Sequence, residues 1–132
     1  MTFTKPIQWV GSSLKDLQSF PPSVQRSAGF MLWKLQLGNT DPSIKPLTGD
    51  PAFRGAKVRE IVEDHASDTY RTVVTVEHEE AVYVLHAFKK KSKSGRATPQ
   101  ADIERIKKRL KAVDAFRASP EGMALRRARS SP

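Results

Sequence analysis

The 132-residue sequence contains no cysteine and no long hydrophobic run. Without cysteine the chain can form no disulfide, no thiolate nucleophile and no Cys-based zinc or iron–sulfur site, which suits a reducing compartment. No apolar run approaches the roughly 20 residues of a membrane-spanning helix, so we expect no membrane partner. The first ten residues lack the basic-then-apolar pattern of a secretory signal, and we therefore expect a cytoplasmic protein.

Familiar catalytic motifs are also missing. The sequence has no Gly-rich phosphate loop, no Gly-x-Ser-x-Gly nucleophile elbow and no constellation of paired carboxylates. The histidines His65, His78 and His86 are separated by 13 and 8 residues, which matches no metal-ligand motif. We therefore expect no metal and no other cofactor, and standard hydrolase and nucleotide-binding activities are weak candidates.

Positive charge, in contrast, is plentiful and concentrated in one part of the chain. Lysine and arginine number 23 against 14 acidic residues, a net charge of +9. From His86 to Pro132 there are 14 basic and 4 acidic residues, so this third of the chain carries +10, while the preceding residues sum to −1. A field of this sign attracts a polyanion, whether nucleic acid, an acidic protein or an anionic membrane surface.

Length and hydrophobic content favour one domain over residues 1–118, followed by a basic tail over 119–132 that is either a short helix or disordered. A first strand is predicted at 6–10. A short helix over 13–17 and a longer one over 22–37 meet at Pro21-Pro22 and suggest a helical hairpin. Residues 40–55 are rich in proline and glycine and predict a loop.

Alternation of apolar and polar residues begins at Lys57 and predicts strands over 57–63, 69–76 and 81–88, joined by turns over 64–68 and 77–80. A further helix begins near Thr98-Pro99 and carries an apolar stripe from Ile103 to Val113. We therefore expect an α+β fold in which an N-terminal helical hairpin packs on a mostly antiparallel four-stranded sheet, with a C-terminal helix.

Arg59 and Arg71 fall inside adjacent predicted strands, and two interpretations remain open. The first is a solvated sheet face on which they pair with Glu60, Glu63 or Glu77. The second is that both guanidinium groups share a face and clamp a phosphate, which their bidentate geometry suits.

Further cations surround the end of the last predicted strand. A basic run of this kind is either a solvated loop or a phosphate contact. His86 lies beside it, as a packed histidine or as a general acid or base. The candidate phosphate-contacting cations are Lys57, Lys89, Lys90, Lys91, Lys93 and Arg96.

The segment Leu85-His86-Ala87-Phe88-Lys89-Lys90-Lys91-Ser92, followed by Ala97-Thr98-Pro99 and a helix, resembles the phage-derived, HigB-like branch of the RelE/ParE toxin superfamily. Upstream, Val58-Arg59-Glu60 and Tyr70-Arg71 are similar to the strand arginines of that family. The likeness in element order covers most of residues 5–114.

The resemblance implies a small toxin of a type II toxin–antitoxin system, neutralised by a helix-turn-helix antitoxin that covers the basic groove. RelE- and HigB-like members cleave mRNA on the ribosome, whereas ParE-like members poison DNA gyrase with the same fold. Our leading expectation is a ribosome-dependent mRNA endoribonuclease. A gyrase inhibitor and a non-catalytic nucleic-acid- or antitoxin-binding module remain as alternatives.

The resemblance also implies roles for individual residues. Arg59, Arg71, His86 and Lys90 are the expected catalytic residues for metal-independent attack of a 2′-hydroxyl on the adjacent phosphate, and the remaining candidate cations are expected to contact RNA. The sequence departs from RelE in having no tyrosine after the basic loop. Tyr70 is either a substitute for it or a packed tyrosine of the sheet.

Overall fold

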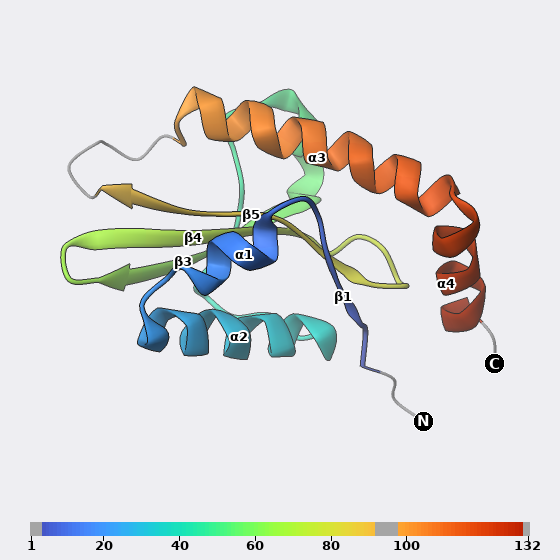
Figure 1. The fold of residues 1–132 in the computed structure, drawn as a ribbon, viewed down its shortest axis with the longest axis horizontal. Helices are drawn as coiled ribbons and strands as arrows, with labels where there is room; N and C mark the ends of the chain where they lie inside the picture. Colours follow the sequence, from blue (N-terminus) through green and yellow to red (C-terminus); the bar gives the residue numbers. More distant parts are fainter. Residues whose placement is uncertain (1–3, 92–97, 131–132) are drawn as a thin grey trace.

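The computed structural model describes residues 4–91 and 98–130 and shows an α+β fold with helices on both faces of a five-stranded sheet (Figure 1). The strand order is β1-β5-β4-β3-β2. Strands β3, β4 and β5 form an antiparallel meander, β2 is antiparallel to β3, and β1 is parallel to β5. The strands are β1 (Ile7–Trp9), β2 (Ile44–Pro46), β3 (Val58–His65), β4 (Asp68–Thr75) and β5 (Val82–Lys91).

The hairpin between β3 and β4 has a tight two-residue turn. His65 pairs with Asp68, and the two residues between them, Ala66 and Ser67, have φ angles of 47° and 72°. Two positive φ angles are typical of the turn type whose twist matches that of the flanking strands. This turn fixes which β3 residue lies opposite each β4 residue, and therefore which side chains share a face.

Helices α1 (Ser13–Gln18) and α2 (Pro22–Gln36) lie on one face of the sheet. The buried stripe of α2, which includes Val24, Ala28 and Leu32, joins a hydrophobic core with Ile61 and Val74 of the sheet. Proline at the first position of α2 starts the helix without losing a backbone hydrogen bond. Gly38, with φ of 81°, follows its end.

Helix α3 (Gln100–Ala118) covers the opposite face. Ile103, Ile106 and Val113 form a second core with sheet residues that include Val73 and Leu85. Leu47 and the short 3₁₀ segment Pro51–Ala56 complete this core through the buried side chain of Phe53. The two faces of the sheet are thus buried by separate sets of helices.

The chain beyond α3 turns sharply into a helix, α4 (Pro120–Ser130). A Cβ atom at Gly122 would come within 2.7 Å of the Cα atom of Arg117, so only glycine permits this close approach. Arg129 donates to the carbonyl of Thr4 across 3.2 Å, which attaches α4 to the N-terminal segment. The basic tail expected over 119–132 is therefore helical through Ser130.

The fold class is as expected, but two details of the prediction are wrong. The sheet has five strands rather than four, because β2 lies inside the segment predicted as a loop. The two N-terminal helices pack on different strands, α1 beside β5 and α2 across β3, instead of forming a simple hairpin layer. Over residues 4–91 and 98–130, no helix is both long and apolar enough to span a membrane.

Candidate functional site

Arg59 and Arg71 lie on opposite faces of the sheet. Arg59 is paired with Val74, whose side chain belongs to the core beneath α2. Arg71 is paired with Val62, three residues further along β3, and successive side chains of a strand point to alternate faces. The expectation that both guanidinium groups share a face is therefore wrong. Arg59 donates instead to the Oγ1 atom of Thr40, over 3.4 Å, in the segment after α2.

Arg71 borders a pocket on the face covered by α3. The pocket has a volume of about 340 Å³ and lies between the sheet, the segment after β2 and the start of α3. We call it the Arg71 pocket, and it is lined by Pro46, Leu47, Thr48, Gly49, Glu60, Arg71, Thr98, Gln100 and Ile103.

Only some of the hydrogen-bond donors of the Arg71 guanidinium have a partner in this pocket. Its Nη1 atom donates to Oε1 of Glu60 across 2.7 Å. Its Nε atom is buried and has no hydrogen-bond partner among the described residues. The buried Nε atom of Arg59 also lacks a partner among the described residues, so this feature alone does not distinguish the two arginines. Arg71 is the candidate phosphate-binding residue because it borders the pocket and uses a single nitrogen for Glu60.

Lys90 is a second cation close to Arg71 and Glu60, although it is not one of the residues that line the Arg71 pocket. Its side chain projects from β5 on the same face as Arg71, since Lys90 pairs with Thr69, two residues from Arg71 on β4. Lys90 is 4% exposed. Burial lowers the pKa of its ammonium group, the nearby charge of Arg71 lowers it further, and Glu60 acts in the opposite direction. Lys90 therefore gives up its proton more readily than an exposed lysine.

The N-terminus of α3 borders the same pocket through Gln100. Pro99 is the capping residue, and no side chain caps the free backbone amides of the first turn. The start of an α-helix carries a partial positive charge and favours anions. Two cationic side chains and a helix N-terminus thus surround one carboxylate, an arrangement suited to phosphate.

His86 does not open into the Arg71 pocket. It is 2% exposed, its ring stacks on Phe88, and its Nε2 atom lies 2.7 Å from Oδ1 of Asp102 on α3. Nη1 of Arg109 lies 3.4 Å from the Nδ1 atom. Burial lowers the pKa of His86, and the hydrogen bond to Asp102 only partly offsets this effect. A neutral ring that accepts from Arg109 and donates to Asp102 satisfies both nitrogens, and it joins β5 to α3.

The other expected residues are dispersed. Lys89 is exposed, with its Nζ atom 3.7 Å from Asp68. Lys57 precedes β3, at the opposite end of the sheet, and lines a separate pocket with Lys107 and Lys111. Lys91 ends β5.

Two expected cations, Lys93 and Arg96, lie outside the described residues. Tyr70 is buried against Phe20, with ring centroids 4.9 Å apart, as a packed tyrosine of the sheet.

Glu60 is the residue that was absent from the expected catalytic set. The sequence indicates Glu60 only as an ion-pair partner of the strand arginines, and Glu60 is that partner for Arg71. Its position in the Arg71 pocket follows from the strand register, because Glu60 and Val62 share a face and Val62 lies opposite Arg71. Assigning the two-residue turn at Ala66 and Ser67 from the sequence would place Glu60 on the same face as Arg71.

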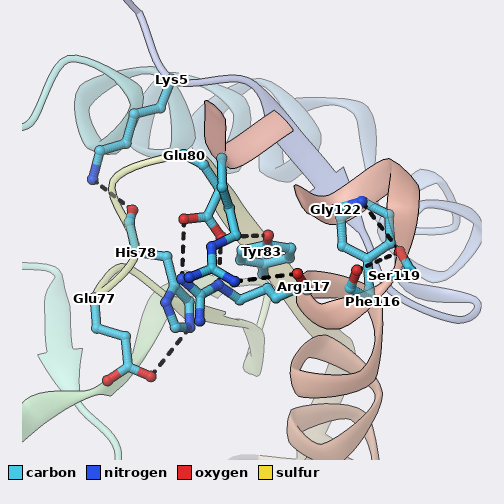
Figure 2. A network of polar contacts seen from close by, with 10 residues as sticks. Lys5, Glu77, His78, Glu80, Tyr83, Phe116, Arg117, Ser119 and Gly122 are labelled. Carbon is cyan, nitrogen blue, oxygen red and sulfur yellow. Dashed lines mark hydrogen bonds and ion pairs between the residues drawn. The ribbon is translucent and has the colours of Figure 1, made fainter. Parts of the chain in front are cut away.

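A second buried carboxylate, Glu80, belongs to a network at the other end of α3 (Figure 2). Its Oε2 atom accepts from Nε of Arg117 at 2.6 Å and from the hydroxyl of Tyr83 at 2.7 Å. Burial alone would raise the pKa of Glu80, but these hydrogen bonds outweigh it and hold the pKa at about 2. The network fastens α3 to the segment between β4 and β5.

Comparison with known proteins gives one family. The family model described as "Phage derived protein Gp49-like" (DUF891) matches residues 15–111, from within α1 to the second half of α3. The matched region contains every described residue of the Arg71 pocket, whereas α4 lies beyond it. No curated protein and no solved structure matches the chain. Because the match covers most of its length, the chain belongs to the family of phage-derived Gp49-like proteins.

Proposed function

We propose that this protein is the toxin of a type II toxin–antitoxin system and that it cleaves mRNA on the ribosome at the Arg71 pocket. The observation that carries the proposal is the grouping of Arg71, Lys90 and Glu60 beside the N-terminus of α3. Membership of the Gp49-like family supports a toxin, and the RelE-like motif of β5 and the basic segment after it supports RNA as the target.

In the proposed reaction, the 2′-hydroxyl of one nucleotide attacks the adjacent phosphorus. The bond from phosphorus to the 5′-oxygen breaks, which leaves a 2′,3′-cyclic phosphate and a 5′-hydroxyl. Arg71 and Lys90 neutralise the negative charge that develops on the phosphate oxygens, the largest single contribution in reactions of this type. The positive end of α3 adds to this field.

Two protons must move in this reaction. Glu60 is a carboxylate next to the phosphate-binding cations, and we assign it the role of the general base that accepts the proton of the attacking 2′-hydroxyl. Lys90, whose pKa is lowered by burial and by Arg71, gives its proton to the departing 5′-oxygen. His86 serves as a positioning residue that holds β5 against α3, and Arg59 has no role in the chemistry.

The proposed partner of the toxin is an antitoxin with a helix-turn-helix domain, as in the RelE/ParE superfamily. An acidic segment that occupies the Arg71 pocket would compete directly with RNA for Arg71 and Lys90. Lys89 and Arg105, both exposed, line a separate pocket beside β5 and α3 and add to the positive field that would attract either polyanion.

The proposal is tested by inducing the wild type, Arg71→Ala and Arg59→Ala in cells and mapping new mRNA 5′ ends by sequencing. Arg59→Ala is a matched control, because it removes the same side chain from the same hairpin on the opposite face. We expect growth arrest and codon-positioned cuts from the wild type and from Arg59→Ala, and neither from Arg71→Ala. Circular dichroism of the purified variants checks that each one is folded.

The opposite results would refute the proposal. Identical cuts from the wild type and Arg71→Ala would exclude the Arg71 pocket as the site of cleavage. Growth arrest without new mRNA ends, together with loss of supercoiling by purified gyrase, would instead establish the gyrase alternative. A folded wild type that leaves growth unaffected would support a non-catalytic binding module.

A further inference from the structure

The outward side of α2 is an unusual surface for a protein of this size. The helix buries one stripe in the core, and its opposite side exposes Phe30 and Trp33, which are 51% and 49% exposed. Their rings stack with centroids 6.0 Å apart and an interplanar angle of 27°. Figure 1 shows α2 as the outermost layer on its side of the sheet, with no other element covering it. Adjacent exposed aromatic side chains typically mark an interaction site.

Neighbouring residues hold the two rings in place. The ammonium of Lys34 lies 5.1 Å from the centroid of the Phe30 ring, a cation–π contact. The same ammonium is anchored to Asp41 at 2.8 Å. Gly29 precedes Phe30, and a Cβ atom built on it would meet nothing within 4 Å, so the helix backbone is open to close approach there. Contacts that pre-position two aromatic side chains lower the conformational entropy lost on binding.

The charge of α2 indicates the chemistry of the partner. The helix contains Arg26 and Lys34 and no acidic residue in its 15 positions. Arg26 is exposed one turn before Phe30, on the same side of the helix. An apolar pair flanked by a cation matches a helix that carries apolar residues on one stripe and carboxylates beside them. A second copy of this chain is a poorer match, because its α2 has no carboxylate to pair with Arg26.

We propose that the surface formed by Arg26, Gly29, Phe30 and Trp33, here called the α2 outer face, binds an acidic amphipathic helix of another protein. This surface lies on the opposite side of the sheet from the Arg71 pocket. A partner on the α2 outer face therefore leaves the pocket accessible, and its binding does not depend on RNA cleavage.

The test begins with photo-crosslinking of the full-length chain in its native host. p-Benzoylphenylalanine replaces Phe30 in one variant and the exposed Lys108 of α3 in a control. The peptide captured at position 30 is sequenced and synthesised. Its binding is then followed by the fluorescence of Trp33 in a Trp9→Phe background, so that the only remaining tryptophan reports on the surface itself.

We expect position 30, and not position 108, to capture an amphipathic segment with acidic residues, and its peptide to shift the Trp33 emission to shorter wavelength. Arg26→Glu should weaken binding about tenfold, as expected for loss of an ion pair and its replacement by repulsion. Arg54→Glu, at an exposed residue outside the α2 outer face, should leave it unchanged.

Four results would overturn the proposal. They are no capture at position 30, capture of a second copy of the chain, a captured segment without acidic residues, and a peptide whose affinity is unaffected by Arg26→Glu. Loss of RNA cleavage in the Arg71→Ala variant would bear only on the proposed function, so the two hypotheses can fail separately.

Discussion

Glu60 and Glu80 each accept a hydrogen bond from an arginine, at 2.7 Å and 2.6 Å, but their surroundings differ. Glu80 also accepts from Tyr83, and Arg117 approaches it with two nitrogens, so both carboxylate oxygens of Glu80 already have partners. Arg71 contacts Glu60 through one nitrogen, and its Nε atom has no partner among the described residues. The Glu80–Arg117 pair therefore stabilises the fold, whereas the Glu60–Arg71 pair retains the capacity to bind a ligand.

Glu80 should make stability depend on pH under acidic conditions. Its pKa is lowered from 4.5 to about 2, so its stabilising effect is fully present above pH 4.5 and is lost as the pH falls toward 2. A shift of this size corresponds to about 3 kcal/mol at neutral pH. Urea denaturation should show Glu80→Gln less stable than the wild type at pH 7 and nearly equal at pH 2. Parallel stability curves over this range would contradict the assignment.

A substitution at His86 can distinguish a positioning role of this residue from a catalytic one. His86→Gln removes the ring that joins Asp102 to β5 and should lower the free energy of unfolding by about 1–3 kcal/mol, as for other buried polar contacts. Below its melting temperature, the variant should cleave RNA with the pH profile of the wild type. A stable His86→Gln protein whose cleavage falls by about a hundredfold would show that the ring transfers a proton.

At the scale of elements, the sequence predicts the meander, the long helices and the apolar stripes, because each has a strong period. It does not predict the register of the β3–β4 hairpin. A turn centred on residue 66 places Arg59 and Arg71 on one face, whereas the observed turn at Ala66 and Ser67 moves the pairing by one residue. Such a change transfers a side chain to the other face of the sheet. Whether Arg59 and Arg71 share a face therefore depends on a shift of one residue in the register of the hairpin.

Other elements carry too weak a signal to be found in the sequence. β2 has three residues, two of them exposed, and ends at Pro46, so it shows no alternating pattern. Its pairing with β3 depends on tertiary contacts of Ile44 and Leu47 rather than on propensity. The sequence does not mark Glu60 as a site residue for a related reason, since the role of an isolated carboxylate in a strand depends on its neighbours on the same face.

The corner between α3 and α4 provides a test at the same scale. Gly122→Ala places a methyl group against the backbone of Phe116 and Arg117, so α4 should detach, with faster amide hydrogen exchange over 120–130. Gly29→Ala is the matched control, because its Cβ atom meets nothing within 4 Å. That variant should be stabilised by up to about 1 kcal/mol through helix propensity. Equal exchange in α4 for both variants would contradict the proposed role of Gly122.

At the scale of the whole molecule, the two proposed binding surfaces lie on opposite sides of the sheet, and the excess positive charge is carried by residues 86–132. The face covered by α3 carries the Arg71 pocket, and the other face carries the α2 outer face. Because the sheet lies between them, the two proposed partners, a polyanion and an acidic helix, would not compete for the same surface. Electrostatic attraction should bring both partners to the molecule faster at low ionic strength.

RNA binding should therefore depend strongly on salt. Affinity for an uncleavable RNA, with 2′-deoxy nucleotides at the cleavage position, should fall linearly on a log–log plot as salt concentration rises. Arg71→Ala should reduce the slope by about one, because one phosphate contact is lost. Phe30→Ser, on the α2 outer face, should leave both affinity and slope unchanged. Salt-independent binding, measured by fluorescence anisotropy, would contradict an electrostatic interface.

The most direct test of the account is the rate of RNA cleavage by purified protein on ribosomes programmed with a defined mRNA. We predict that Arg71→Ala slows single-turnover cleavage about a hundredfold or more, as expected for loss of a group that stabilises the transition state. Arg59→Ala should cleave at nearly the rate of the wild type, and a 2′-deoxy nucleotide before the cut should abolish cleavage. Equal rates for the two arginine variants, or cleavage of the 2′-deoxy substrate, would contradict the account.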